Sequence, residues 1–208
     1  MTAVSPMPNL DFFNSQDCQV AMLSWSERFL LYSLVRGLEP QRLLEIGFAS
    51  GGSSRIMLAA LDANHGAEQR LVSIDPQPHA APAWTGDSRF TLLREPSPQA
   101  IPHAIEVLGG PVDFCFIDAN HAESYVYADS CGAADVVAHD GYILYHDAFY
   151  PDVQRAVDRF LKDRGDFVDC GLISRFRSKA PTPWGGFRLL RRAAPCDLGA
   201  FHPLTVPI

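Results

Sequence analysis

Two periods of hydrophobic residues alternate along this chain. Short apolar runs that end in glycine or a polar residue are typical of buried strands, and they occur at residues 42–46, 70–74, 90–94, 112–117 and 142–145. Between them, apolar residues recur every three or four positions, which predicts helices. The expected helices cover residues 17–35, with Asp17 as N-cap, then a segment from Ser53 or Ser54 to a stop at 64–66, then 97–108, 123–137 and 152–163.

Strands that alternate with helices predict a doubly wound α/β fold, with a mostly parallel sheet covered by helices on both faces. Residues 167–173 and 186–190 read as a terminal hairpin. We therefore expect seven strands, with an antiparallel C-terminal strand. One domain is expected over residues 17–194, preceded by a loosely ordered segment at 1–16 and followed by a tail at 195–208.

Composition and charge narrow the class of protein. The 208 residues are 47% hydrophobic and 20% charged, as in folded globular chains. The net charge of −7 argues against a general nucleic-acid binder, which needs clustered Lys and Arg. The densest basic clusters, residues 175–179 and 188–192, are short, and we interpret them as solvated edges.

Cysteine usage and the N-terminus indicate a reducing compartment. The five cysteines have no C-x-x-C spacing and an odd count, so neither a disulfide framework nor a cysteine zinc site is expected. Cys115 lies in an apolar run and is interpreted as a small core residue. The chain begins without the pattern of a signal peptide, and no apolar run approaches the roughly 20 residues of a membrane span. We expect a cytoplasmic protein with no membrane partner.

A glycine-rich loop joins the first strand to the next helix. Gly47, Gly51 and Gly52 follow a G-x-x-x-G-G spacing, which differs from the G-x-G-x-x-G of dinucleotide-binding folds. Glycines let a backbone approach a ligand closely, and the helix that follows offers free N–H groups to an anion. The loop predicts a site for an anionic or zwitterionic ligand, with a tight turn without ligand as the alternative.

Acidic residues close the neighbouring strands. The carboxyl ends of parallel strands meet at one edge of the sheet, where ligands bind. Asp75 closes the second strand, where it can accept hydrogen bonds from two ribose hydroxyls, and Glu95 closes the third, within reach of an adenine or ribose edge. Solvated loop acids are the alternative for both positions.

These motifs, taken in order, resemble one family. L-E-I-G at residues 44–47, G-G-S at 51–53, V-S-I-D at 72–75, F-I-D-A-N-H at 116–121 and G-Y-I-L-Y-H-D at 141–147 are similar to class I S-adenosylmethionine-dependent methyltransferases, in the small-molecule O-methyltransferase-like branch. The resemblance covers about residues 27–160. It implies a Rossmann-like methyltransferase fold and S-adenosyl-L-methionine as the cofactor.

The resemblance also implies a cofactor site. The loop backbone would face the methionine part of the cofactor, and Asp75 would hold the ribose. Two departures stand out: Ala49 replaces a middle glycine common in the family, and Glu95-Pro96-Ser97 replaces its frequent G-D-S. The expected cofactor-binding residues are Glu45, Gly47, Phe48, Ala49, Ser50, Gly51, Ser53, Asp75, Glu95 and Asp118.

Two histidines and two aspartates close the fourth and fifth strands, and they allow three interpretations. In the first, Asp118, His146 and Asp147 bind Mg²⁺ or another divalent cation, which lowers the pKa of a substrate hydroxyl; imidazole, however, favours softer metals than Mg²⁺. In the second, no metal binds and catalysis rests on His121 as general base, with Asp118 beside it. In the third, the histidines are structural.

The sequence therefore favours an S-adenosylmethionine-dependent methyltransferase that O-methylates a small molecule, either a sugar or a secondary metabolite. A nicotinamide-dependent reductase on a similar fold and a non-catalytic cofactor-binding subunit are the alternatives. The expected partner is a small-molecule methyl acceptor and not a nucleic acid. The N-terminal helix and the terminal hairpin are the candidate surfaces for a homodimer.

Overall fold

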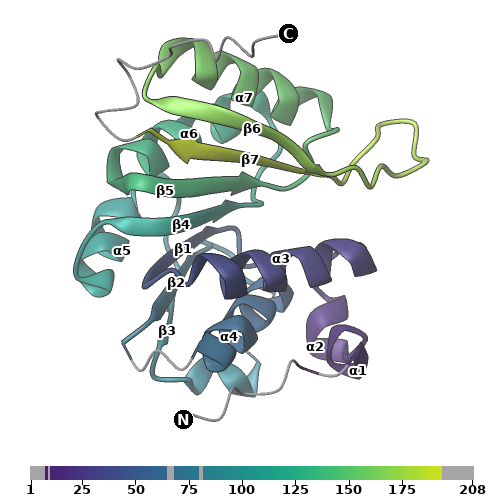
Figure 1. Cartoon of the computed structure of the whole chain (residues 1–208), viewed down its shortest axis with the longest axis vertical. Helices are drawn as coiled ribbons and strands as arrows, with labels where there is room; N and C mark the ends of the chain where they lie inside the picture. Colours follow the sequence, from purple (N-terminus) through teal and green to yellow (C-terminus); the bar gives the residue numbers. More distant parts are fainter. Residues whose placement is uncertain (1–7, 9, 65–67, 80–81, 194–208) are drawn as a thin grey trace, which may run out of the picture.

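In the computed structural model, which describes residues 8, 10–64, 68–79 and 82–193, the strands form one seven-stranded sheet with helices on both faces (Figure 1). The order of strands is β3-β2-β1-β4-β5-β7-β6. The strands are β1 (Arg42–Ile46), β2 (Arg70–Ile74), β3 (Phe90–Leu93), β4 (Val112–Ile117), β5 (Val137–Tyr145), β6 (Phe167–Ser174) and β7 (Phe187–Arg192). The predicted fold class is confirmed: β7 runs antiparallel to both of its neighbours, and the other pairs are parallel.

Successive side chains of each central strand point to opposite faces of the sheet and are buried on both. Leu43 packs with one apolar cluster, beside α3 and α4, whereas Leu44 packs with the other, beside α5, α6 and α7. Continuous apolar runs in the sequence follow from this burial on both sides. The helices are α1 (Leu10–Phe13), α2 (Gln16–Gln19), α3 (Trp25–Leu38), α4 (Gly52–Asn64), α5 (Ile101–Leu108), α6 (Glu123–Val136) and α7 (Pro151–Asp163), with a 3₁₀ turn η1 (Ala83–Gly86).

The prediction of one helix over residues 17–35 is wrong. The helix α2 ends at Gln19, and the chain then turns through Met22, whose φ of 56° cannot continue a helix. A new helix, α3, starts after Ser24, which forms a reciprocal capping box with Glu27. The N-cap at Ser24 and the left-handed backbone conformation of Met22 outweigh the helical spacing of the apolar residues.

Other boundaries differ by a few residues. The strand β5 starts at Val137, earlier than expected, with a register shift against β4, and α5 starts at Ile101. Within the N-terminal segment expected to be loosely ordered, α1 packs Phe13 into the core. Residues 1–7 and 9 of that segment and the tail at 195–208 lie outside the described residues. Cys115 is buried in the sheet, as predicted, and burial raises the pKa of its thiol.

The topology positions the site. The chain leaves β1 toward β2 and β3 on one side, and β4 and β5 lie on the other side, so the order of strands reverses between β1 and β4. A doubly wound sheet opens a crevice at such a reversal, outside the carboxyl ends of the strands. Among the described helices, none has the length and apolar character needed to cross a membrane.

Candidate functional site

The glycine loop lies directly against the end of β4. A Cβ on Gly47 would stand 2.0 Å from the backbone oxygen of Asp118, and Gly47 has a φ of 101°. Only glycine combines that close approach with that backbone conformation. The two strand ends that flank the crevice are therefore in contact through Gly47 and Asp118.

Glu45 supports the loop from below. Its fully buried carboxyl accepts hydrogen bonds from Ser53 Oγ at 2.5 Å, Ser73 Oγ at 2.5 Å and the Ser54 hydroxyl. Burial raises the pKa of Glu45 to about 7, and the three serine hydroxyls oppose that rise. Glu45 thus ties β1 and β2 to the first turn of α4, and its side chain lies outside the two cavities described below.

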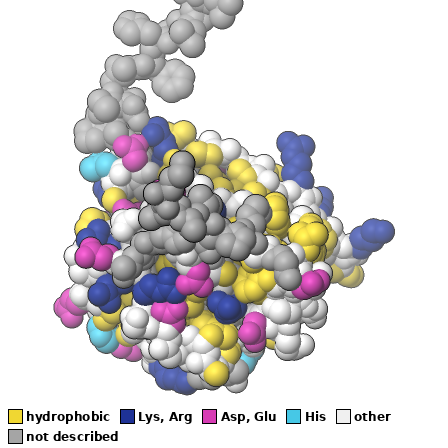
Figure 2. Space-filling model, turned by 60° about the horizontal axis from the view of Figure 1, so that its bottom comes forward, with side chains coloured by type: hydrophobic (Ala, Val, Ile, Leu, Met, Phe, Trp, Pro, Cys, Tyr) yellow, Lys and Arg dark blue, Asp and Glu magenta, His cyan; other side chains and the backbone are white. Residues whose placement is uncertain are grey.

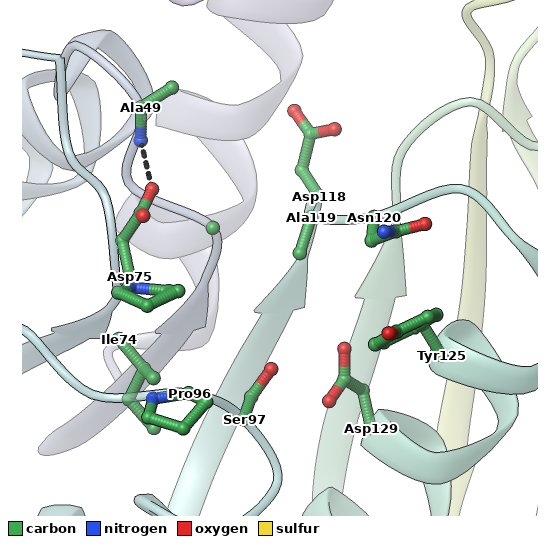
Figure 3. A pocket seen from close by; sticks show the side chains of 12 residues that line it. Ala49, Ile74, Asp75, Pro96, Ser97, Asp118, Ala119, Asn120, Tyr125 and Asp129 are labelled. Carbon is green, nitrogen blue, oxygen red and sulfur yellow. Dashed lines mark hydrogen bonds between the residues drawn. The ribbon is translucent and has the colours of Figure 1, made fainter.

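Asp75 holds the loop from the side. Its Oδ2 accepts hydrogen bonds from the backbone N–H groups of Phe48 at 3.1 Å and Ala49 at 2.7 Å, and its Oδ1 accepts one from Gln77 at 2.8 Å. Figure 3 shows the bond to Ala49 beside the open space of a cavity. Asp75 therefore meets the loop and the cavity at once.

The first cavity has a volume of about 350 Å³ and crosses the crevice between β2, β1 and β4. At its far end lies Asp129, on α6, opposite Ser97 and near Tyr125 (Figure 3). Asp129 is 2% exposed, and its Oδ1 has no hydrogen-bond partner. Burial raises its pKa to about 6. The cavity is lined by Gly47, Ala49, Ile74, Asp75, Pro76, Pro96, Ser97, Asp118, Ala119, Asn120, Tyr125 and Asp129.

Sequence reasoning missed Asp129. It lies in the middle of a helix, far from any strand end, so no local motif singles it out. The only sequence signal for Asp129 is an acidic residue in a helical segment that also holds alanines and a glycine. The helical pattern assigns its face of α6 to packing.

Four of the predicted cofactor residues, Glu45, Ser50, Gly51 and Glu95, line neither cavity. Glu95 Oε1 is 2.8 Å from His103 Nδ1 in an exposed pair, and the neighbouring Pro96 and Ser97 line the cavity instead. Ser50 lies in the loop without lining either cavity. Gly51 has a φ of 80° and no room for a Cβ, because the ring of Phe48 packs against it.

A second cavity, of about 370 Å³, adjoins the first. The two share Gly47, Ala49, Asp118 and Ala119. Its walls are mostly apolar, and its polar floor is built from the residues that close β4 and β5. It is lined by Val20, Ala21, Met22, Gly47, Phe48, Ala49, Ser53, Asp118, Ala119, His121, His146, Asp147, Tyr150 and Trp184.

His121 lies between two carboxylates on this floor. Its Nε2 is 2.7 Å from Asp147 Oδ2 and 3.8 Å from Asp118 Oδ1. Asp118 and Asp147 raise the pKa of His121 to about 9. Near neutral pH the imidazole is therefore mostly protonated, which the sequence alone did not predict.

His146 lies behind His121, with 4% of its surface exposed. Its Nδ1 is 3.4 Å from both Asp118 Oδ2 and Asp147 Oδ2, and its Nε2 is 3.7 Å from Glu27 Oε2. Burial disfavours the charged ring, but the carboxylates, Asp118 first, bring its pKa well above the ordinary value.

Glu27 completes this charged cluster from α3, and sequence reasoning did not include it. It is fully buried, and its Oε1 accepts hydrogen bonds from Gly186 N–H at 2.8 Å and Ser174 Oγ at 3.0 Å. Burial alone would raise its pKa, but His146 and Ser24 lower it below the ordinary value. A partner so distant in sequence leaves no local signal.

Asp147 connects the floor to the segment before β7. Its Oδ1 accepts the backbone N–H of Gly185 at 2.5 Å, and its own φ is 53°. Burial opposes ionisation, but His121 and His146 hold its pKa well below the usual range. Asp147 is therefore a carboxylate at neutral pH.

Three side chains on this floor could hold a metal ion. Asp118, His121 and Asp147 each offer a ligand atom within 4.8 Å of the others. Two carboxylates with one imidazole fit a divalent transition ion better than Mg²⁺. His146, named in the predicted ligand set, lies outside this group of three.

Two of three comparisons with known proteins find matches for this chain. Residues 44–148 match the family model Methyltransf_24, described as a methyltransferase domain. A search of curated proteins finds no match. Solved structures of the same fold include the O-methyltransferase TomG of Streptomyces achromogenes, in complex with S-adenosylmethionine, at 19% identity over 93% of each chain and a TM-score of 0.65.

Two further structures share the fold. An O-methyltransferase of Bacillus cereus bound to S-adenosylhomocysteine is 15% identical over 92% of this chain and 93% of its own, with a TM-score of 0.62. The Podospora anserina methyltransferase PaMTH1, also bound to S-adenosylhomocysteine, is 18% identical over 92% and 91%, with a TM-score of 0.63. The chain belongs to the methyltransferase-domain family, which confirms the predicted membership of the class I S-adenosylmethionine-dependent methyltransferases.

Proposed function

We propose that this methyltransferase transfers the methyl group of S-adenosylmethionine to a hydroxyl of a small molecule. One observation carries the proposal: two cavities of similar size meet at Gly47, Ala49, Asp118 and Ala119, and one of them ends on an acid–histidine floor. A cofactor in the first cavity would face an acceptor in the second across this shared wall. The TomG structure contains S-adenosylmethionine and the Bacillus and Podospora structures contain its product, which supports this assignment.

The first cavity suits each part of the cofactor. The zwitterionic methionine end would lie on the loop at Gly47 and Ala49, on the side where α4 begins. Asp75 would accept bonds from the ribose hydroxyls. The unpaired Oδ1 of Asp129 suits the exocyclic amino group of adenine, a donor that would satisfy a buried acceptor.

Methyl transfer to an acceptor in the second cavity would be a displacement at the methyl carbon. The acceptor oxygen would form a bond to the methyl carbon while the sulfur–methyl bond breaks, and the electron pair of the broken bond would stay on sulfur. The hydroxyl proton passes to the neutral imidazole of His121, and Asp118 and Asp147 stabilise the resulting imidazolium. With a pKa of about 9, about one His121 in a hundred is neutral at pH 7.

A bound divalent ion is the second candidate for the same floor, because Asp118, His121 and Asp147 fit one. When bound, such an ion lowers the pKa of an acceptor hydroxyl. It would compete with the proton on His121, since the imidazole must be neutral to act as a ligand.

The walls of the second cavity favour one of the two predicted acceptor classes. Val20, Ala21, Met22, Tyr150 and Trp184 offer aromatic and aliphatic surface, whereas a sugar presents many hydroxyls that need polar partners. We therefore propose an apolar hydroxylated metabolite as acceptor. A homodimer and a cytoplasmic location stay predictions.

Calorimetric titration with S-adenosylmethionine and with NADH, each with and without Mg²⁺ or Mn²⁺, tests the cofactor assignment. S-adenosylmethionine should bind and NADH should not. Asp75→Ala should weaken binding, whereas Asp113→Ala, on the opposite end of the sheet, should not. Failure of S-adenosylmethionine to bind the wild-type protein would refute the proposed function.

A further inference from the structure

A protruding loop borders the second cavity. Residues 175–186 join β6 to β7 and project from the sheet (Figure 1). The loop is closed on itself, because Ser178 N–H donates to the Trp184 oxygen at 2.9 Å and Trp184 N–H donates to Ser178 Oγ at 3.0 Å. It is anchored below by Gly185 on Asp147 and by Gly186 on Glu27. Because the base of the loop is held on the acid–histidine floor, the loop has a defined position relative to the cavity.

This loop contributes to the cavity wall. Trp184 lines the second cavity, and 39% of its surface stays exposed. The Trp184 ring packs against Phe176, with centroids 5.6 Å apart. The loop therefore borders the proposed acceptor cavity.

The loop carries unneutralised positive charge. Arg175, Arg177 and Lys179 are exposed, and within the described part of the chain they form no ion pair. By contrast, Arg164 and Arg188 each pair with two carboxylates. Figure 2 shows Lys and Arg side chains that project from the right-hand side, where Figure 1 places the loop. Three cations without a carboxylate partner within five residues are notable in a chain of net charge −7.

One of these cations contacts the segment that follows β5. The Arg177 guanidinium lies over the Phe149 ring, 5.5 Å from its centroid. Phe149 N–H donates to the Gly185 oxygen at 3.1 Å, and the next residue, Tyr150, lines the cavity. Arg177 is therefore held beside a residue whose chain neighbour, Tyr150, belongs to the cavity wall, although Arg177 itself does not line the cavity.

We infer that this loop selects acceptors that carry an anionic group at the end opposite the reacting hydroxyl. The inference rests on the proposed function, because it assumes that the hydroxyl lies at Asp118 and His121. An apolar body would then contact Tyr150 and Trp184, and the far end would emerge beside Arg175, Arg177 and Lys179. Guanidinium groups match the planar geometry of a carboxylate. The acceptor class is thus a hydroxylated apolar acid.

Isosteric pairs of phenols test the inference by calorimetry on the protein saturated with S-adenosylhomocysteine. The pairs are para-hydroxybenzoate and para-hydroxyphenylpropanoate, each with its neutral amide. Each acid should bind about fivefold tighter than its amide, the scale of exposed charge pairs, and 0.5 M salt should reduce the difference. The triple variant Arg175→Gln, Arg177→Gln, Lys179→Gln should abolish the preference. Lys162→Gln, an exposed cation on α7, should retain it.

Three results would overturn the inference: equal binding of acid and amide, a preference that survives the triple variant, or no binding of any of the four phenols to the complex. In each case S-adenosylhomocysteine still binds, so the proposed function is unaffected. Unchanged affinity of the triple variant for S-adenosylhomocysteine shows that the loop substitutions leave the fold intact. Failure of wild-type protein to bind cofactor or product is a separate outcome that refutes the proposed function itself.

Discussion

The proton acceptor in methyl transfer can be tested by the pH dependence of the rate. His121 has a pKa raised to about 9 by Asp118 and Asp147, and only its neutral form accepts a proton. The neutral fraction grows about ninefold between pH 7 and pH 8 and levels off above pH 9. We expect the logarithm of kcat/KM for a phenolic acceptor to rise by about one for each pH unit between pH 7 and pH 8 and to level off above pH 9. Initial rates at saturating S-adenosylmethionine, with EDTA present, measure it.

The variant His121→Gln removes the base and keeps a polar side chain of similar reach. The rate should fall by about a hundredfold or more, and the inflection near pH 9 should disappear. His79→Gln, a histidine outside both cavities, is the matched control and should retain the wild-type profile.

Two results would refute this reasoning. A flat wild-type profile between pH 7 and pH 9 would exclude a titrating base of pKa about 9, and an inflection that survives in His121→Gln would assign it to another group. Restoration of the neutral-pH rate by Mn²⁺, together with loss of activity in EDTA, would favour the metal at Asp118, His121 and Asp147 instead.

Three further predictions concern the cofactor side. Gly47→Ala should reduce affinity for S-adenosylmethionine at least about tenfold in calorimetry, since its Cβ would stand 2.0 Å from the Asp118 oxygen; Gly37→Ala, where nothing lies within 4 Å, should leave it unchanged. Burial raises the pKa of Glu45 from 4.5 to about 7, so its ionisation costs the folded state about 3 kcal/mol as pH rises from 4.5 to 7. Urea midpoints should show that loss in the wild-type protein and less of it in Glu45→Gln. Asp129→Ala should weaken S-adenosylmethionine binding about tenfold through the lost acceptor, and unchanged affinity would remove Asp129 from the adenine site.

The sequence by itself determined the parts of this protein that depend on local periodicity and strand ends. Apolar runs that alternate with helical segments predicted the sheet, and glycine spacing predicted the loop at Gly47. Because carboxyl ends of parallel strands meet at one edge, Asp75, Asp118, His121 and Asp147 were expected at one crevice, and they line its two cavities.

Only the tertiary structure decided which side chains share a partner. Glu95 turns to His103 instead of the cavity, and Asp129 enters the cavity from a helix with no motif. Glu27 reaches His146 across more than a hundred residues of chain, and His121 acquires its raised pKa only when Asp118 and Asp147 lie on either side of it. Electrostatic and hydrogen-bond partners depend on distances of a few ångströms between segments remote in sequence, and no local pattern encodes those distances.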